Sequence, residues 1–76
     1  MQETKIILRD IDSIRDFVRK VIQVDYEVDL VQGRYIIDAK SIMGIFALDT
    51  LSPITVVAHT DNAADFFATI DKYIVR

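Results

Sequence analysis

The spacing of the apolar residues changes near Tyr26, and this change constrains the fold more than any other feature of the sequence. Along 13–24 the apolar residues recur every three or four positions, which is the period of an amphipathic helix. Along 26–30 and again along 35–39 they alternate with polar residues, which is the period of a half-buried strand. A chain of 76 residues therefore combines helix and sheet, and at this length we expect a single domain, 1–76.

The same patterns predict seven elements in the order βαββαβα. Gln32-Gly33-Arg34 supplies the turn of a hairpin, and Ser52-Pro53 ends a short helix. We expect Asp12-Ser13 to cap the first helix, Ser41 the second and Asp61-Asn62 the last. The predicted elements are a strand at 5–8, a helix at 13–24, strands at 26–30 and 35–39, a helix at 42–49, a strand at 54–58 and a helix with an apolar stripe from 63 to 74.

This order predicts an α+β fold, an open-faced β-sandwich in which a four-stranded antiparallel sheet carries three helices on one face. The other face of the sheet would be solvated. The predicted core residues of the sheet are Val28, Leu30, Ile37, Ala39, Ile54, Val56 and Ala58. Those of the helices are Phe17, Val21, Ile45, Leu48, Phe66 and Ile70.

Composition excludes several classes of function. A net charge of −3 lacks the basic footprint of a nucleic-acid-binding protein. With no cysteine and one histidine, the chain cannot form disulfides, thiolate zinc sites or multi-histidine metal sites, and two glycines leave no glycine-rich phosphate loop. No apolar run approaches the ~20 residues that span a bilayer, and the N-terminus does not resemble a signal peptide. We expect a cytoplasmic protein with no bound metal, no cofactor, and no contact with nucleic acid or membrane.

The most specific string in the chain is IDAKSIMG, at 37–44. It resembles the regulatory-serine segment of HPr, the phosphocarrier protein of the bacterial sugar phosphotransferase system. In that family a strand ends in Lys-Ser and a short helix begins Ser-Ile-Met-Gly. The resemblance extends from Ser13 to the C-terminus by element order and apolar spacing. It implies an HPr-like fold.

The chain departs from this family in the segment that holds the family's phosphate-carrying histidine. The family's histidine lies in a Gly-Ile/Leu-His-Ala-Arg-Pro-Ala string before the first helix, which aligns with 8–14 here. Asp10 falls at about the position of the histidine and Asp12 at that of the arginine. A phosphohistidine carrier needs a neutral imidazole and positive donors, whereas two carboxylates repel phosphate. We therefore interpret Asp10 and Asp12 as a vestigial active site and expect no catalytic residue and no enzymatic activity.

Ser41 has two roles that are compatible. As a helix cap, its side chain would accept a backbone N–H hydrogen bond. The resemblance also implies that Ser41 is a regulatory phosphorylation site, modified by a kinase of the HPr kinase/phosphorylase type. A phosphate there would add roughly −1.5 to −2 charges at a helix N-terminus.

Ile42, Met43 and Phe46 fall on the second predicted helix, next to Ser41. The resemblance implies that this surface docks protein partners, namely phosphotransferase-system or regulatory proteins. Methionine and aromatic side chains are also typical of interfaces. The sequence leaves open whether these three residues contact a partner or are buried under the neighbouring loops.

Three alternatives to a non-catalytic adaptor remain open. The first is phosphoryl transfer through an unorthodox acceptor such as Asp10, with Asp12 and Asp16 completing a magnesium cluster. The second is a small metabolite-binding regulatory domain. The third is an oligomer that buries the outer sheet face, where Val31, Ile36 and Val57 would lie. His59, the one histidine, follows a strand and has no predicted partner.

Overall fold

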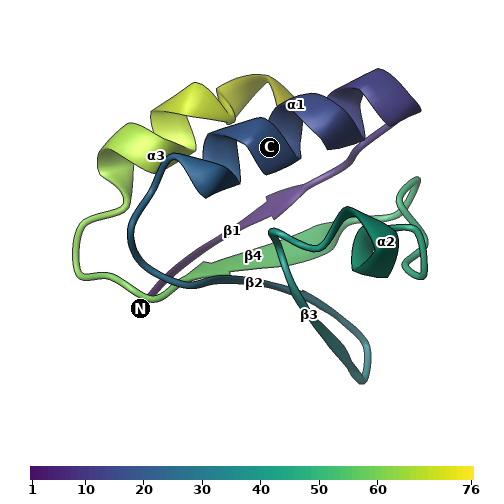
Figure 1. Ribbon diagram of the computed structural model, residues 1–76, viewed down its shortest axis with the longest axis horizontal. Coiled ribbons are helices and arrows are strands. Elements are labelled where there is room, and N and C mark those ends of the chain that lie inside the picture. The colour runs from purple at the N-terminus through teal and green to yellow at the C-terminus, as the bar shows by residue number, and fades with distance from the viewer.

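The protein, described over residues 1–76 by a computed structural model, has the predicted element order (Figure 1). A short 3-10 helix, which the sequence did not predict, follows the last α-helix. The elements are β1 (Gln2–Ile6), α1 (Ile11–Ile22), β2 (Val28–Gln32), β3 (Tyr35–Asp38), α2 (Ile42–Ile45), β4 (Ile54–Ala58), α3 (Ala64–Thr69) and η1 (Asp71–Tyr73).

The four strands form one antiparallel sheet, as predicted, and their order in the sheet is β1-β4-β2-β3. The hairpin between β2 and β3 turns at Gly33, whose φ of +58° is the sign required at the first central residue of a type II′ turn. Glycine adopts this conformation without the steric cost that a Cβ atom would impose.

The core lies between the sheet and the helices, with α1 and α3 side by side over the sheet in Figure 1. All six predicted helical core residues are buried, and so are all the predicted sheet residues except Ile37. Ile37 is half-buried and packs against this core from β3, at the edge of the sheet. The fold class is therefore confirmed. No helix is long and apolar enough to cross a bilayer.

The first strand and the first helix both begin earlier in the chain than predicted. β1 covers Gln2–Ile6 rather than 5–8, because pairing with β4 extends the strand toward the N-terminus through residues that have no apolar period. Leu8 is buried in the loop instead, where its backbone N–H donates to the carbonyl of Thr50. The first cap was also wrong, since α1 begins two residues earlier than predicted and Asp10 caps it.

The last two helices are shorter than predicted. α2 has only four residues, followed by turns to 49. The N-cap position of α3 is Ala63 rather than Asp61 or Asn62, but Asn62 Oδ1 accepts a hydrogen bond from the N–H of Ala64, the first residue of the helix, at 3.3 Å. The apolar stripe does not form one helix, because Ile74 pairs with Ile6 at the free edge of β1 and strand pairing requires an extended backbone.

Candidate functional site

The segment before α1 ends in a capping carboxylate. Asp10 Oδ1 accepts a hydrogen bond from the backbone N–H of Ser13 at 2.8 Å. This backbone hydrogen bond lowers the pKa of Asp10, because it stabilises the charged carboxylate. Asp12 lies exposed in the first turn, where the helix dipole favours negative charge. The two carboxylates thus serve the helix N-terminus, and the site has no imidazole.

His59 lies at the other end of the sheet. Ile6, at the end of β1 that leads into α1, pairs with Ile54, whereas His59 follows the opposite end of β4. Its Nε2 atom lies 2.8 Å from Asp29 Oδ2 on β2. The sequence analysis missed this partner. The alternation of side chains along β4 could have indicated it. Asp29 and Val57 are register partners on the outer face of the sheet, and His59, two residues after Val57, falls on the same face.

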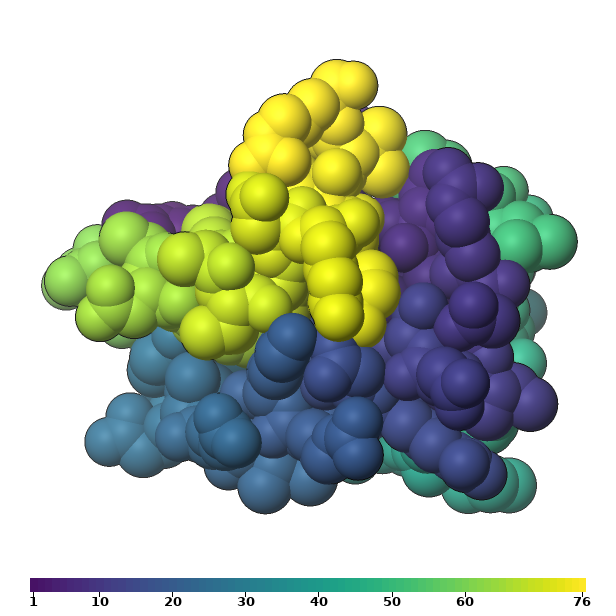
Figure 2. Space-filling model, turned by 90° about the horizontal axis from the view of Figure 1, so that it is seen from above, coloured from purple at the N-terminus to yellow at the C-terminus, as the bar shows by residue number.

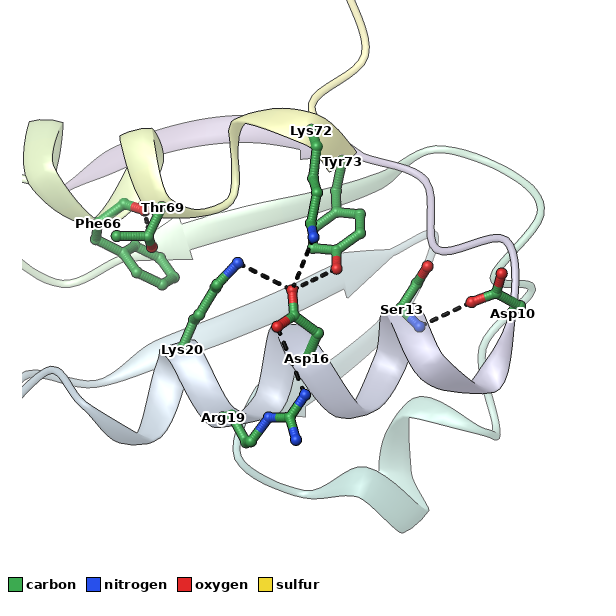
Figure 3. Close-up of polar contacts among 9 residues, drawn as sticks. All are labelled: Asp10, Ser13, Asp16, Arg19, Lys20, Phe66, Thr69, Lys72 and Tyr73. Carbon is green, nitrogen blue, oxygen red and sulfur yellow. Dashed lines mark hydrogen bonds and ion pairs between the residues drawn. The ribbon is translucent and has the colours of Figure 1, made fainter.

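Asp16 belongs to a polar cluster that links α1 to the C-terminal segment (Figure 3). Its Oδ2 atom accepts a hydrogen bond from the Tyr73 hydroxyl at 2.5 Å and from Lys20 Nζ at 2.9 Å, and Lys72 Nζ lies 3.5 Å away. The Tyr73 hydrogen bond and the ammonium groups hold the pKa of Asp16 far below its usual range. Burial and the neighbouring carboxylate raise the pKa of Tyr73 to about 12.

Asp10, Asp12 and Asp16, considered above as a magnesium cluster, therefore have separate roles. Asp10 caps the helix, Asp12 is exposed, and the charged carboxylate of Asp16 is held by Tyr73, Lys20 and Lys72. No group of three or more acidic or histidine side chains comes together to hold a metal ion.

Ser41 caps α2, as predicted. Its Oγ atom accepts a hydrogen bond from the backbone N–H of Gly44 at 3.1 Å, and the side chain is exposed. A turn at 38–41 positions it: the N–H of Ser41 donates to the carbonyl of Asp38, and the N–H of Lys40 donates to the Asp38 carboxylate, both at 2.9 Å.

Gly44 allows α2 to approach β3 closely. A Cβ atom at this position would meet Ile37 Cγ2 at 2.6 Å and Ser41 Oγ at 3.1 Å. The glycine of the Ser-Ile-Met-Gly string thus has a packing role, because any side chain there would displace the helix from the sheet.

The three predicted docking residues differ in exposure. Met43 and Phe46 are 78% and 50% exposed, whereas Ile42 is half-buried and packs against the core. Ile11 and Leu51 are also exposed. Figures 1 and 2 show that the start of α1, α2 and the loop after α2 gather at one end of the molecule. We call Ile11, Met43, Phe46 and Leu51 the apolar end surface.

The loop that carries Leu51 is fixed by hydrogen bonds. The Gln32 side chain both donates to the carbonyl of Asp49 and accepts from its N–H, each at 2.8 Å. The Leu8 N–H to Thr50 carbonyl bond joins the same loop to the segment before α1. These bonds fix the part of the apolar end surface that Leu51 contributes. No pocket is found on the molecule.

Comparison with known proteins identifies the fold. No family model matches the sequence, and no curated protein matches it. Among solved structures, the crystal structure of HPr-C-His from Thermoanaerobacter tengcongensis matches with a TM-score of 0.79 at 19% sequence identity, over 95% of this chain and 89% of that one. The chain has an HPr-like fold. At this identity the likeness establishes the fold alone.

The HPr-like fold confirms the resemblance drawn from 37–44. Ser41 caps α2, in keeping with a helix that begins Ser-Ile-Met-Gly, although β3 ends at Asp38 and Lys40 lies in the turn between the two elements. The start of α1, in contrast, presents Asp10 as the cap and Asp12 in the first turn, and no histidine.

Proposed function

We propose that this HPr-like chain is a non-catalytic adaptor or regulator connected with the phosphoenolpyruvate-dependent sugar phosphotransferase system. It binds a protein partner through the surface around α2 and does not carry phosphate on histidine. The observation that carries the proposal is the exposure of Met43 and Phe46 beside Ser41, in a chain whose segment before α1 holds a capping carboxylate. The setting would be the cytoplasm, with no cofactor.

The chemistry at the start of α1 supports the loss of carrier activity. The low pKa of Asp10 keeps its carboxylate charged at neutral pH, and Asp12 lies in the first turn of α1. A negative phosphoryl group would be repelled there rather than stabilised. His59 is at the far end of the sheet and is paired with Asp29, so it does not replace the missing imidazole.

The chemistry of α2 supports partner binding. Large apolar side chains that remain half or more exposed are typical of contact residues rather than of the core. Ile42 would contribute the edge of the same surface, since it is only half-buried. The hydrogen bonds that fix the loop at 49–53 favour a surface held ready for binding, which lowers the entropy cost of association.

Ser41 would act as the switch of this surface. Its exposed hydroxyl is accessible to a kinase of the HPr kinase/phosphorylase type. Phosphorylation adds about −1.5 to −2 charges beside Met43 and Phe46, and burying that charge against an apolar partner would oppose binding.

Phosphoryl transfer through Asp10 and metabolite binding have no observation in their favour. Asp10 as a phosphate acceptor would need a carboxylate cluster for Mg²⁺, and Asp16 is committed to Tyr73 and the lysines. A metabolite-binding domain would need a pocket with convergent polar groups.

Titration of the chain with purified enzyme I and with purified HPr kinase/phosphorylase tests the docking surface by calorimetry. We expect at least one to bind, and Phe46→Ala to weaken that binding by more than about tenfold, as for a buried aromatic anchor. Ile22→Ala is the matched control, because Ile22 is similarly exposed (59%) but lies at the other end of α1. Equal binding by Phe46→Ala and wild type, with both folded by circular dichroism, would contradict the proposal.

A further inference from the structure

The two edges of the sheet differ. The edge of β1 is covered by the C-terminal segment: the N–H of Ile7 donates to the carbonyl of Tyr73 at 3.0 Å, and the N–H of Val75 donates to the carbonyl of Lys5 at 2.8 Å. Figure 2 shows this segment, in yellow, lying against α1. β3 pairs only with β2, and no strand pairs with its other side. Such an edge is a template for another strand.

The backbone groups on the free side of β3 can be assigned from the register. The N–H of Ala39 donates to the carbonyl of Val28 at 2.9 Å, so Ala39 points its backbone toward β2. Alternation then directs Tyr35 and Ile37 toward β2, and Ile36 and Asp38 outward. The outward carbonyl of Asp38 is already used by Ser41. The unpaired groups are therefore the N–H and C=O of Ile36 and the N–H of Asp38.

The side chains at this edge are apolar in the middle and charged at the ends. Ile36 is 71% exposed and faces away from the helices, beside its half-buried register partner Val31. Arg34 and Asp38 stand two residues to either side of Ile36, on the same face by parity. Neither forms an ion pair within the chain, and Asp38 is directly opposite Asp29, a pairing of like charges that is unfavourable.

We propose that a second copy of this chain pairs with β3, antiparallel and with its two-fold axis at Ile36. Ile36 of each copy then exchanges two hydrogen bonds with its counterpart, and the N–H of Asp38 donates to the carbonyl of Arg34 of the second copy. This register places Arg34 opposite Asp38 of the second copy, twice, so each carboxylate that faces Asp29 gains a cation. The two Ile36 side chains cover each other next to Val31.

The alternation of backbone groups along β3 and the charges of its flanking residues favour this register over the two nearest alternatives. A shift by one residue would oppose outward-facing Ile36 to inward-facing Ile37. A two-fold axis at Ile37 would oppose Arg34 to Lys40 of the second copy, which is a repulsive pair. The strand has only four residues, so the interface is far below the ~1,600 Å² of a standard one and the dimer is weak and reversed by dilution.

Sedimentation velocity over a concentration series tests the proposal through a charge swap. Arg34→Asp and Asp38→Arg each place like charges opposite one another, so each is expected to weaken self-association by at least tenfold. An equimolar mixture of the two variants restores both ion pairs and is expected to associate as a heterodimer about as strongly as the wild type. Arg15→Asp, the same change at an exposed position on α1, is the control and leaves dimerisation unchanged.

Asp38→Arg also removes the hydrogen bond that the Asp38 carboxylate accepts from the N–H of Lys40, so it can disturb the turn. Ile36→Lys is a second variant that leaves this turn intact. Two lysines at the axis repel, so this variant is expected to remain monomeric while its thermal unfolding stays close to that of the wild type. A wild-type chain that is monomeric at every concentration overturns the proposal and leaves the edge for a strand of another protein. So does a dimer that survives Ile36→Lys, or a variant mixture that associates no better than its components.

Discussion

At the scale of single residues, Asp16 shows how the C-terminal segment is tied to α1. Its carboxylate accepts hydrogen bonds from Tyr73, 57 residues away in sequence, and from Lys20 on its own helix. Charge-assisted hydrogen bonds of this kind are stronger than those between neutral groups. The pairing favours charged Asp16 and neutral Tyr73, which moves their pKa values in opposite directions.

This pairing predicts an acid-sensitive contribution to stability. The pKa of Asp16 is lower in the folded chain than in the unfolded chain, so its contribution is complete at neutral pH and is lost as the pH falls below about 4. Asp16→Asn is therefore expected to lower the melting temperature at pH 7, with a difference from wild type that shrinks toward pH 2. Asp61→Asn, which removes no hydrogen bond or ion pair of the side chain, is the control for this thermal denaturation series. A constant difference at every pH would contradict the argument.

Ser41 makes a second prediction at this scale. Ser41→Ala removes the acceptor for the Gly44 N–H and is expected to cost about 0.5–2 kcal/mol of unfolding free energy. Ser41→Asp is expected to be nearly neutral, because aspartate also caps and suits the helix dipole. Urea denaturation of the three proteins distinguishes the cases, and equal destabilisation by both substitutions would argue against the cap.

At the scale of elements, hydrophobic period predicts which segments are helix and strand, but not where they end. β4 was predicted at its observed bounds because all its apolar residues belong to one short buried run. The final helix was predicted too long, since Tyr73 and Ile74 continue the helical period although their contacts are with Asp16 and β1. Tertiary pairing overrides local period there.

The contact between α2 and β3 gives a prediction about an element. Gly44→Ala is expected to destabilise the fold by about 1–3 kcal/mol, because the new Cβ meets Ile37 and β-branched side chains have few rotamers in which to move away. In an Ile37→Ala background the same substitution is expected to cost much less, since the opposing Cγ2 atom is gone and only the 3.1 Å contact with Ser41 Oγ remains tight. A double-mutant cycle by urea denaturation measures this coupling. Equal destabilisation by Gly44→Ala in both backgrounds would show that the close contact between α2 and Ile37 does not limit the residue at position 44.

At the scale of the whole molecule, the fold was predicted because period, turn residues and the 37–44 string all indicated one topology. The site was predicted only in part. The cap at Ser41 was predicted because it depends on local sequence, whereas the sequence left the exposure of Met43 and Phe46 open. The pairing of His59 with Asp29 depends on strand register, which the period of one strand does not specify.

The whole-molecule claim is that an HPr-like fold here serves binding without phosphate transfer, and a transfer assay tests it most directly. The chain and an active HPr are incubated in one tube with enzyme I and labelled phosphoenolpyruvate, and the two are separated by mass. We predict label on the active HPr and none on this chain, because Asp10 aligns with the family's histidine, Asp12 aligns with its arginine, and His59 lies at the far end of the sheet. Stoichiometric, acid-labile label on this chain that is lost in His59→Ala would contradict the account.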